Sequence, residues 1–245
     1  MEGSYLGPEF SELTIENELK RLNAKFIKHE EKKFIETIAK DLSNQLTVGW
    51  FQGRMEFGPR ALGSRSILCD PRSEKMQKEL NLKIKFRESF RPFAPAIIRE
   101  DLNNWFNLNS DSPYMLLVSE IKNDIKINMT ESENKLFGID KLNVKRSKIP
   151  AVTHVDYSAR IQTVHKETNP KFYKLIKNFK EITNCPVLVN TSFNIRGEPI
   201  VCSIEDAFKC FMGTNLDILA IGNFILRKKD QDKSLLKNYR DKFEL

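Results

Sequence analysis

The 245-residue sequence predicts an α/β protein with a mixed sheet. Short apolar segments typical of strands interleave with segments of helical periodicity, and no internal repeat is present. The composition, with 40% hydrophobic and 30% charged residues, excludes wholesale disorder, collagen and a coiled-coil rod. No apolar run approaches the ~18 residues of a membrane span, and the first ten residues have no secretory-signal pattern. We therefore expect a globular domain.

The first hundred residues contain three predicted helices and three predicted strands. Ser11 is expected to cap a helix over residues 11–22, which places Ile15, Leu19 and Leu22 on one face. The elements expected after it are helices at 30–43 and about 73–82, and strands at 46–51, 66–69 and 94–98. Asp70-Pro71 is expected to end the second of these strands.

The second half begins with a polar segment, residues 119–149, which predicts a surface insertion or a partly mobile loop. The elements expected after it are strands at 151–155, 159–164, 185–190, 217–222 and 224–228, and helices at 170–182 and 203–213. Asn169-Pro170 begins the first of these helices, and a capping box of Ser203 and Asp206 begins the second. The predicted organisation is a helical segment 1–45, a main domain 46–228 and a basic tail 229–245.

The net charge of +7 favours an anionic partner, and its distribution narrows the choice. Residues 50–100 hold eleven basic and six acidic residues, so this fifth of the chain carries most of the excess. Its arginines are Arg54, Arg60, Arg65, Arg72, Arg87, Arg91 and Arg99. Because the planar arginine fork makes bidentate contacts to phosphate and carboxylate, this clustering indicates an anion-binding region.

Cysteine and histidine usage argues against a metal centre. The four cysteines have neither a C-x-x-C pair nor zinc-ligand spacing, which predicts free thiols in a reducing cytoplasm. The three histidines likewise lack ligand spacing, so no metal site is predicted within this chain. The residues concerned are Cys69, Cys185, Cys202 and Cys210, and His29, His154 and His165.

Two basic motifs carry candidate binding chemistry. The first, GRMEFGPRALGSRSIL (53–68), sets arginines among glycines and a proline, as in loops that surround phosphate, but it has neither Walker A nor dinucleotide-fingerprint spacing. The second, NLKIKFRESFRPFAPAI (81–97), alternates basic with aromatic residues. That alternation suits single-stranded nucleic acid or a small-anion pocket, and both alternatives remain open from the residues alone.

Two further motifs are less charged. In HVDYSARIQTV (154–164), His154 and Asp156 could pair as acid and base, although a structural histidine is the favoured interpretation. In VLVNTSFNIRGEPIV (187–201), a buried strand ends in Asn190, Thr191 and Ser192, where α/β sheets bind ligands. These polar groups can donate to phosphate or ribose, or they can satisfy a local turn. No nucleophile-elbow pattern surrounds Ser192.

Together and in this order, the four motifs resemble the carboxy-terminal domain of the nodulation-protein-U/cephamycin-type carbamoyltransferases (NodU/CmcH). The resemblance runs from about Val48 to Val201, and YLGPEF at residues 5–10 is similar to the family's interdomain junction. It implies a YrdC-like fold, which is a twisted mixed sheet flanked by helices, with a basic cavity.

The resemblance also implies a reaction. In the family, carbamoyl phosphate and ATP, the latter with Mg²⁺, form a carbamoyl-adenylate intermediate. A preceding domain of the actin/Hsp70-like ATPase superfamily then transfers the carbamoyl group to an acceptor hydroxyl. The motif positions imply binding of carbamoyl phosphate and nucleotide phosphates by Arg60, Lys85, Arg91 and Arg160, with Ser192, Asn190 and Asn194 nearby. Lys85 and Arg91 would be the catalytic residues, because preplaced cations stabilise charge at phosphorus.

Some features depart from the family pattern. The chain is too short to include the amino-terminal domain with its metal-binding histidines, so we expect that domain as a missing partner. Tyr157 stands where relatives tend to have glycine, which could narrow the cavity. The alternative function is a non-catalytic polyanion (RNA) or docking module. The uncharged NTSFN cluster favours small phosphorylated substrates over nucleic acid. The sequence leaves open whether the chain forms a homodimer.

Overall fold

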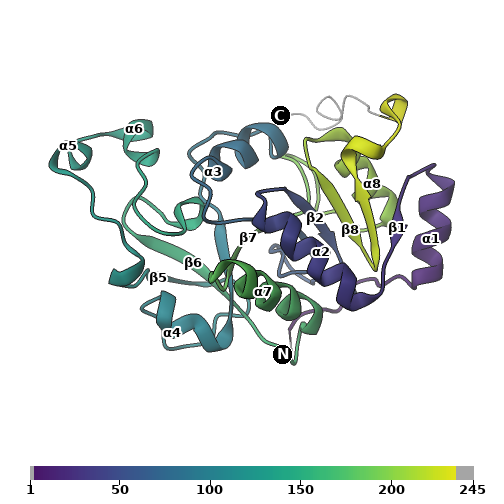
Figure 1. The fold of residues 1–245 in the computed structure, drawn as a ribbon, viewed down its shortest axis with the longest axis horizontal. Coiled ribbons are helices and arrows are strands. Elements are labelled where there is room, and N and C mark those ends of the chain that lie inside the picture. The colour runs from purple at the N-terminus through teal and green to yellow at the C-terminus, as the bar shows by residue number, and fades with distance from the viewer. Residues whose placement is uncertain (1–2, 236–245) are drawn as a thin grey trace.

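A computed structural model describes residues 3–235, which form one mixed nine-stranded sheet flanked by helices (Figure 1). The strands are β1 (Ile27–Lys28), β2 (Val48–Phe51), β3 (Arg65–Cys69), β4 (Ala94–Ile98), β5 (Leu117–Glu120), β6 (Ser158–Val164), β7 (Val187–Ser192), β8 (Ile218–Ile221) and β9 (Phe224–Arg227). Their order across the sheet is β1-β9-β8-β2-β3-β7-β4-β6-β5. The predicted α/β class with a mixed sheet is therefore confirmed.

The position of β7 decides which strand ends meet. The pairs β2–β8 and β4–β6 are parallel, and the other neighbouring strands are antiparallel. β7 lies between β3 and β4 and runs antiparallel to both. Its carboxyl end therefore lies beside the amino end of β4, and the amino end of β6 follows on the far side of β4. The polar end of the NTSFN motif is thus one strand away from the start of β6, which carries Arg160.

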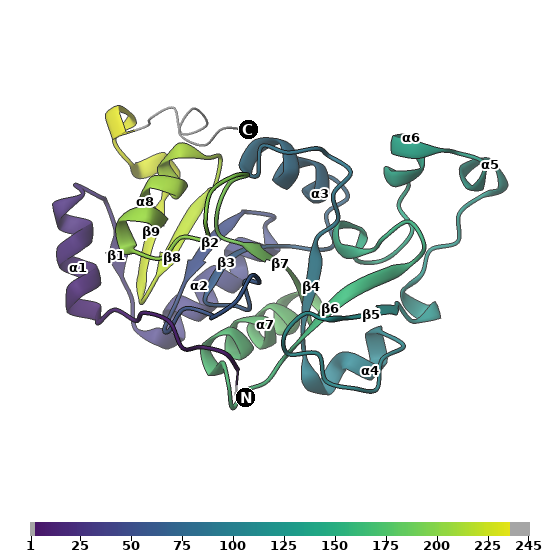
Figure 2. The ribbon, with the colours of Figure 1, turned by 180° about the vertical axis from the view of Figure 1, so that it is seen from behind.

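Helices cover both faces of the sheet. They are α1 (Glu12–Arg21), α2 (Glu31–Ser43), α3 (Met76–Glu79), α4 (Leu102–Trp105), α5 (Glu131–Asn134), α6 (Gly138–Leu142), α7 (Pro170–Thr183) and α8 (Ile204–Gly213). α2 and α7 pack together over one face, and α8 lies on the other with α1 beside it (Figures 1 and 2). The predicted caps Ser11, Asn169 and Ser203 each accept a backbone N–H in the first turn of α1, α7 and α8.

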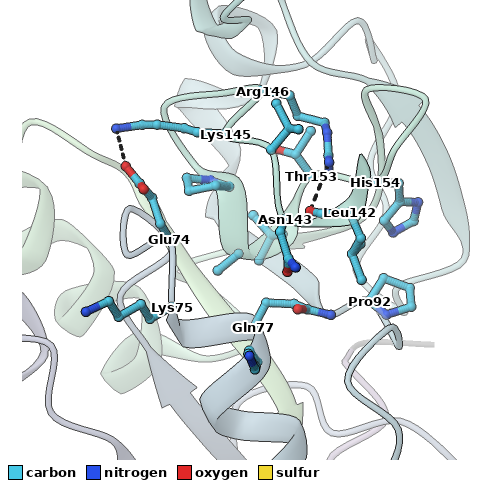
Figure 3. A pocket seen from close by; sticks show the side chains of 15 residues that line it. Glu74, Lys75, Gln77, Pro92, Leu142, Asn143, Lys145, Arg146, Thr153 and His154 are labelled. Carbon is cyan, nitrogen blue, oxygen red and sulfur yellow. Dashed lines mark hydrogen bonds and ion pairs between the residues drawn. The ribbon is translucent and has the colours of Figure 1, made fainter. Parts of the chain in front are cut away.

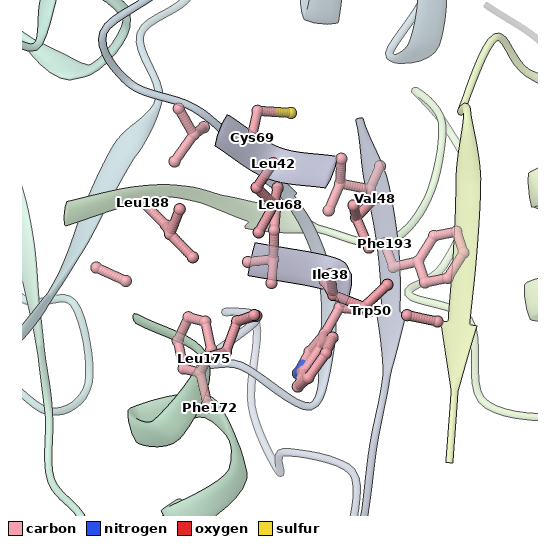
Figure 4. Packing of buried hydrophobic residues seen from close by; sticks show 14 of the residues in the cluster. Ile38, Leu42, Val48, Trp50, Leu68, Cys69, Phe172, Leu175, Leu188 and Phe193 are labelled. Carbon is pink, nitrogen blue, oxygen red and sulfur yellow. The ribbon is translucent and has the colours of Figure 1, made fainter. Parts of the chain in front are cut away.

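The core between the sheet and the α2–α7 pair follows from the period-two alternation of β2. Val48 and Trp50 point toward the helices, where the Trp50 ring lies 5.8 Å from that of Phe34 in α2 (Figure 4). Phe172 and Leu175 supply the α7 side of this layer. Each such side chain stabilises the fold by roughly 1.5–3 kcal/mol through burial. This layer fixes α7 relative to the strands that carry the polar motifs.

Three local predictions differ from the structure. The strand expected at 151–155 is wrong, because Pro150–Val152 form a 3₁₀ turn whose apolar side chains are buried without strand pairing. The helix expected at about 73–82 begins later, at Met76, and widens into a π-helical turn at Leu80–Ile84. The polar segment 119–149, which was expected to be a surface insertion or a partly mobile loop, contains the end of β5 and the two short helices α5 and α6.

Residues 236–245 of the predicted basic tail lie outside the described residues. Within residues 3–235, none of the helices has the length and apolar character needed to cross a membrane.

Candidate anion-binding site

A cavity of about 120 Å³ lies at the carboxyl end of β7. Four separate parts of the chain line most of it, namely the loop 59–61, Arg87 with residues 92–94, Arg160 at the start of β6, and residues 190–192. Met115 completes the wall. The structure therefore brings together parts of all four sequence motifs, and it does so because β7 runs antiparallel to β4.

The clustered arginines differ in whether they form an ion pair with a carboxylate. Four of them pair with carboxylates, as Arg54–Glu9, Arg72–Asp70, Arg91–Glu88 and Arg99–Asp111. Arg60 and Arg87, together with Arg160 from β6, make no ion pair within residues 3–235, and these three line the cavity. Arg65 also makes no ion pair, but its guanidinium donates to backbone carbonyls and it does not line the cavity.

Burial and repulsion from neighbouring arginines destabilise the charge on the guanidinium groups of Arg87 and Arg160. Burial, and then the charge of Arg91, lowers the pKa of Arg87 to about 10. Burial, and then Arg60, lowers the pKa of Arg160. A bound anion would offset both effects, since an opposite charge nearby favours the charged form. Binding of an anion in the cavity would therefore stabilise the charged forms of both arginines.

Arg87 is held in place by two contacts. Its Nε donates to Asn81 Oδ1 at 2.7 Å, and its guanidinium lies 4.9 Å from the centroid of the Phe93 ring. Asn81 is fully buried, and its Nδ2 donates to backbone carbonyls of Gln77, Ser89 and Arg91. Asn81 thus ties the segment before β4 to α3 and orients Arg87. The alternation of basic residues in the sequence drew attention to Arg87 without singling it out.

The arginine-rich loop is shaped by two buried ionic groups that face inward. Glu56 Oε1 accepts the backbone N–H groups of Leu62 and Ser64 at 2.7 and 2.6 Å. Arg65 is fully buried, donates to carbonyls including that of Gln52, and lies 3.6 Å from the Phe51 ring centroid. These contacts hold the loop whose exposed Arg60 lines the cavity. Glu56 was not predicted, although it is the one carboxylate in this motif.

Lys85 lies beneath the end of β7 with only 3% of its surface exposed. Its Nζ donates to the carbonyl and hydroxyl oxygens of Ser192 and to the carbonyl and Oδ1 of Asn194, the last at 2.8 Å. Burial, and then the charge of Arg87, lowers its pKa to about 7. Lys85 therefore holds the NTSFN segment in place, and its ammonium group donates its hydrogen bonds to oxygens of the protein itself.

The three residues of the fourth motif that were predicted to bind ligand occupy different positions. Ser192 lines the cavity, and its Oγ donates to Asn194 Oδ1 at 2.6 Å. Asn194 does not line it, and its Nδ2 donates to the carbonyl of Glu198. Asn190 lines the cavity, but its amide hydrogens are used within the chain, on Ala61 O and Gln162 Oε1. Asn190 therefore has no spare amide hydrogen for a ligand, and its Oδ1 is enclosed without a hydrogen-bond partner within residues 3–235.

Two predicted features lie away from the cavity. Arg91 is exposed, and its Nε contacts Glu88 at 2.9 Å. Tyr157 does not line the cavity either. It lies in a turn with a φ of +65°, a conformation that suits glycine, and its hydroxyl donates to Ile127 O. The structure therefore explains a glycine preference at 157 by backbone conformation rather than by space in the cavity.

His154 and Asp156 are connected through a third residue. Both lie in the turn before β6 rather than on a strand. Ser158 Oγ is 3.1 Å from His154 Nδ1 and donates to Asp156 Oδ1 at 2.7 Å. Burial lowers the pKa of His154. The favoured interpretation, a structural histidine, agrees with this geometry.

A second cavity, of about 260 Å³, lies between the α3 region and residues 142–154 (Figure 3). It shares Pro92 with the first cavity, and Lys75, Lys78 and Arg146 contribute its positive charge. Lys145 at its rim pairs with Glu74 at 2.8 Å. Within residues 3–235, no group of three His, Cys, Asp or Glu side chains is placed to hold a metal ion.

The three arginines that line this small cavity at the strand ends have no carboxylate partner within residues 3–235, an arrangement typical of anion-binding sites. The family model "Carbamoyltransferase C-terminus" matches residues 39–228, and the chain belongs to this family. The resemblance found through the four motifs is thereby confirmed.

Individual relatives are longer than this chain. The uncharacterised protein sll1178 of Synechocystis is 51% identical over 248 residues, covering 100% of this chain and 40% of that protein. A 3'-hydroxymethylcephem-O-carbamoyltransferase of Amycolatopsis lactamdurans is 36% identical over 165 residues, covering 67% of this chain and 27% of that enzyme. A crystal structure of full-length HypF overlaps 84% of this chain and 22% of its own, at 16% identity and a TM-score of 0.45, too loosely to transfer a site. The chain spans less than half of either sequence relative.

Proposed function

We propose that the cavity binds carbamoyl phosphate and that the chain combines it with ATP and Mg²⁺ to form a carbamoyl-adenylate intermediate. The observation that carries this proposal is the convergence of Arg60, Arg87 and Arg160, without carboxylate partners, on about 120 Å³ of space. Arginine forks match phosphate oxygens, and this volume suits a small anion rather than a drug-sized ligand of ~300 Å³ or more. Membership of the carbamoyltransferase family supports carbamoyl phosphate as that anion.

The nucleotide needs more room than the first cavity offers. The second cavity adjoins it at Pro92 and carries Lys75, Lys78 and Arg146. We assign ATP to the space that runs from the arginines toward this second cavity, so that its α-phosphate lies near Pro92. The metal ion would arrive with ATP and be held by its phosphates.

Transfer to the acceptor is assigned to a separate domain. The relatives are longer than this chain, which supports an amino-terminal actin/Hsp70-like domain as the partner that delivers the carbamoyl group to a hydroxyl. Within this chain, Lys85 would position Ser192 and Asn194. Arg91 would act on phosphate only after leaving Glu88.

Calorimetry with fresh carbamoyl phosphate and with ATP·Mg²⁺ tests the binding step. We expect Arg60→Ala and Arg160→Ala each to weaken carbamoyl phosphate binding by about 10–100-fold, since a hydrogen bond to a charged group contributes roughly 1.5–3 kcal/mol. Arg54→Ala is the matched control, because Arg54 pairs with Glu9 outside the cavity. Arg91→Ala decides whether that side chain joins the site. A folded wild-type chain that binds no phosphate compound would end the proposal.

The chemical step has its own assay. Water would first cleave carbamoyl phosphate to carbamate and inorganic phosphate, and the carbamate oxygen would then attack the α-phosphorus of ATP and expel pyrophosphate. Labelled pyrophosphate should therefore exchange into ATP only when carbamoyl phosphate and Mg²⁺ are both present. Arg160→Ala should abolish this exchange, and Arg54→Ala should keep it. Binding of carbamoyl phosphate without pyrophosphate exchange would indicate that the chain is a binding module that does not form the adenylate. A steep loss of RNA affinity with salt, together with no carbamoyl phosphate binding, would instead support the polyanion alternative.

A further inference from the structure

A segment near the amino end of the described chain lies along the arginine-rich loop. Residues 4–8, which we call the amino-terminal strap, pair with the start of this loop through backbone hydrogen bonds. Phe57 N donates to Ser4 O at 2.7 Å. Gly7 N donates to Met55 O at 2.9 Å. The loop that contributes to the cavity is therefore held by residues far from it in the sequence.

Tyr5 extends from the amino-terminal strap to the other end of the loop. Its hydroxyl donates to Leu62 O at 2.9 Å. Its side chain also packs against a buried cluster formed by Leu62, Ala94 and Met115. Ala94 and Met115 line the anion cavity, and so does Arg60. Tyr5 therefore joins two walls of the cavity, one formed by Ala94 and Met115 and the other by the loop that carries Arg60.

The Tyr5 hydroxyl has a defined role as a donor to the loop. Burial raises the pKa of Tyr5, so the hydroxyl keeps its proton at neutral pH. Its oxygen accepts a hydrogen bond from Asn169 Nδ2 at 3.2 Å, which leaves the hydroxyl hydrogen for Leu62 O. The Asn169 amide is itself oriented, because its Oδ1 accepts the Phe172 N–H in the first turn of α7. The hydroxyl thus links the amino-terminal strap, the loop and α7.

Removing this hydroxyl would leave both of its partners with another hydrogen bond. Leu62 O also accepts from Gln162 Nε2 at 2.8 Å, and Asn169 Nδ2 also donates to Gly63 O at 3.1 Å. The substitution Tyr5→Phe therefore leaves neither group unsatisfied, so its cost in stability is expected to be small. What the hydroxyl adds is a restraint on the position of the loop.

We propose that Tyr5 is a positioning residue for the anion cavity, which restrains the loop so that Arg60 meets the phosphate group of carbamoyl phosphate. This inference rests on the proposed function. Arg60 is exposed and forms no ion pair within residues 3–235, so no carboxylate fixes the direction of its side chain. Its direction follows from the backbone of the loop, and Tyr5 holds the carbonyl two residues later. Restraining a binding group before the ligand arrives increases affinity, because less conformational freedom is lost on binding.

Calorimetry with carbamoyl phosphate and with inorganic phosphate on the wild type and Tyr5→Phe tests this role. We expect Tyr5→Phe to weaken binding of both compounds by about threefold to tenfold, the range that corresponds to the net contribution of one neutral hydrogen bond. Tyr157→Phe is the matched control and should bind as the wild type does, because the Tyr157 hydroxyl also donates to a backbone carbonyl but lies away from the cavity. Equal affinities for the wild type and a folded Tyr5→Phe variant would overturn the proposal.

A double-mutant cycle separates positioning of Arg60 from a general effect on the fold. In an Arg60→Ala background, Tyr5→Phe should cause no further loss of phosphate affinity, because the side chain that it positions is gone. The effect of Tyr5→Phe on the free energy of unfolding should be the same in both backgrounds. A loss of phosphate affinity that persists in full without Arg60 would refute the assignment, since Tyr5 would then act through the fold as a whole.

A second variant perturbs the same contact from the opposite side. A Cβ added at Gly3 would lie 2.8 Å from the Tyr5 ring, so Gly3→Ala would displace that ring. Gly3→Ala should therefore also weaken phosphate binding, and it decides the question if Tyr5→Phe does not fold. A wild-type chain that binds no phosphate compound would refute the proposed function itself, whereas phosphate binding that neither variant weakens would refute only this inference.

Discussion

The buried ammonium of Lys85 gives the sharpest quantitative prediction. Its pKa is lowered to about 7 in the folded protein, against an ordinary value of 10.5. Between these two pH values the unfolded chain binds more protons than the folded chain, so stability must rise as pH rises. Integrating this difference from pH 7 to pH 9 gives roughly 2 kcal/mol of added stability from this single group.

The substitution Lys85→Met isolates that contribution. Urea unfolding of wild type and variant at pH 7, 8 and 9 should give a stability difference that shifts by roughly 2 kcal/mol in favour of the wild type as pH rises. Other titrating groups cancel in the difference. Lys32→Met, an exposed position on α2, is the control and should show no such trend. Parallel pH profiles for wild type and Lys85→Met would refute the argument that burial destabilises the charge.

Two further predictions concern the frame of the site. Gly63→Ala should destabilise the fold by roughly 2–5 kcal/mol in urea unfolding, because a Cβ there would lie 2.2 Å from the Phe172 ring at a φ of +102°. Gly58 also has a positive φ, but no atom lies within 4 Å of a Cβ added there, so Gly58→Ala should lower the free energy of unfolding clearly less. Equal destabilisation by the two substitutions would contradict the proposed collision with Phe172. Asn81→Ala should weaken phosphate binding by about tenfold in calorimetry, since it releases Arg87. The double variant Asn81→Ala/Arg87→Ala should then bind phosphate almost as well as Arg87→Ala alone. Fully additive losses of phosphate affinity would show that Asn81 does not act through Arg87.

Local sequence signals predicted much of the fold because they depend on neighbouring residues. Asn169-Pro170 and the Ser203 capping box begin their helices as expected. The strand at 151–155 failed because an alternating apolar pattern does not distinguish a strand from a buried 3₁₀ turn after Pro150. Strand order also lay beyond local signals, since the insertion of β7 between β3 and β4 joins segments distant in the chain.

The candidate site was predictable in its charge but not in its detail. The arginine cluster indicated an anion site, yet which arginines remain without acidic partners depends partly on carboxylates that only the fold brings close. Glu9, for example, pairs with Arg54 from 45 positions away. Arg160 was chosen through the family resemblance, and the structure places it with Arg60. The unpaired Oδ1 of Asn190 depends on Gln162, and no sequence pattern indicates such a pairing.

The place of β7 in the sheet also bears on the order of events during synthesis. β3 and β4 are made early, but neither gains its β7 neighbour until residues 187–192 have left the ribosome. Until then two strand edges stay open, and edges of this kind invite pairing with other chains. The anion cavity cannot close before this late insertion, because residues 190–192 form one of its walls. Phosphate affinity in a refolding chain would therefore report the completed sheet rather than an early collapsed state.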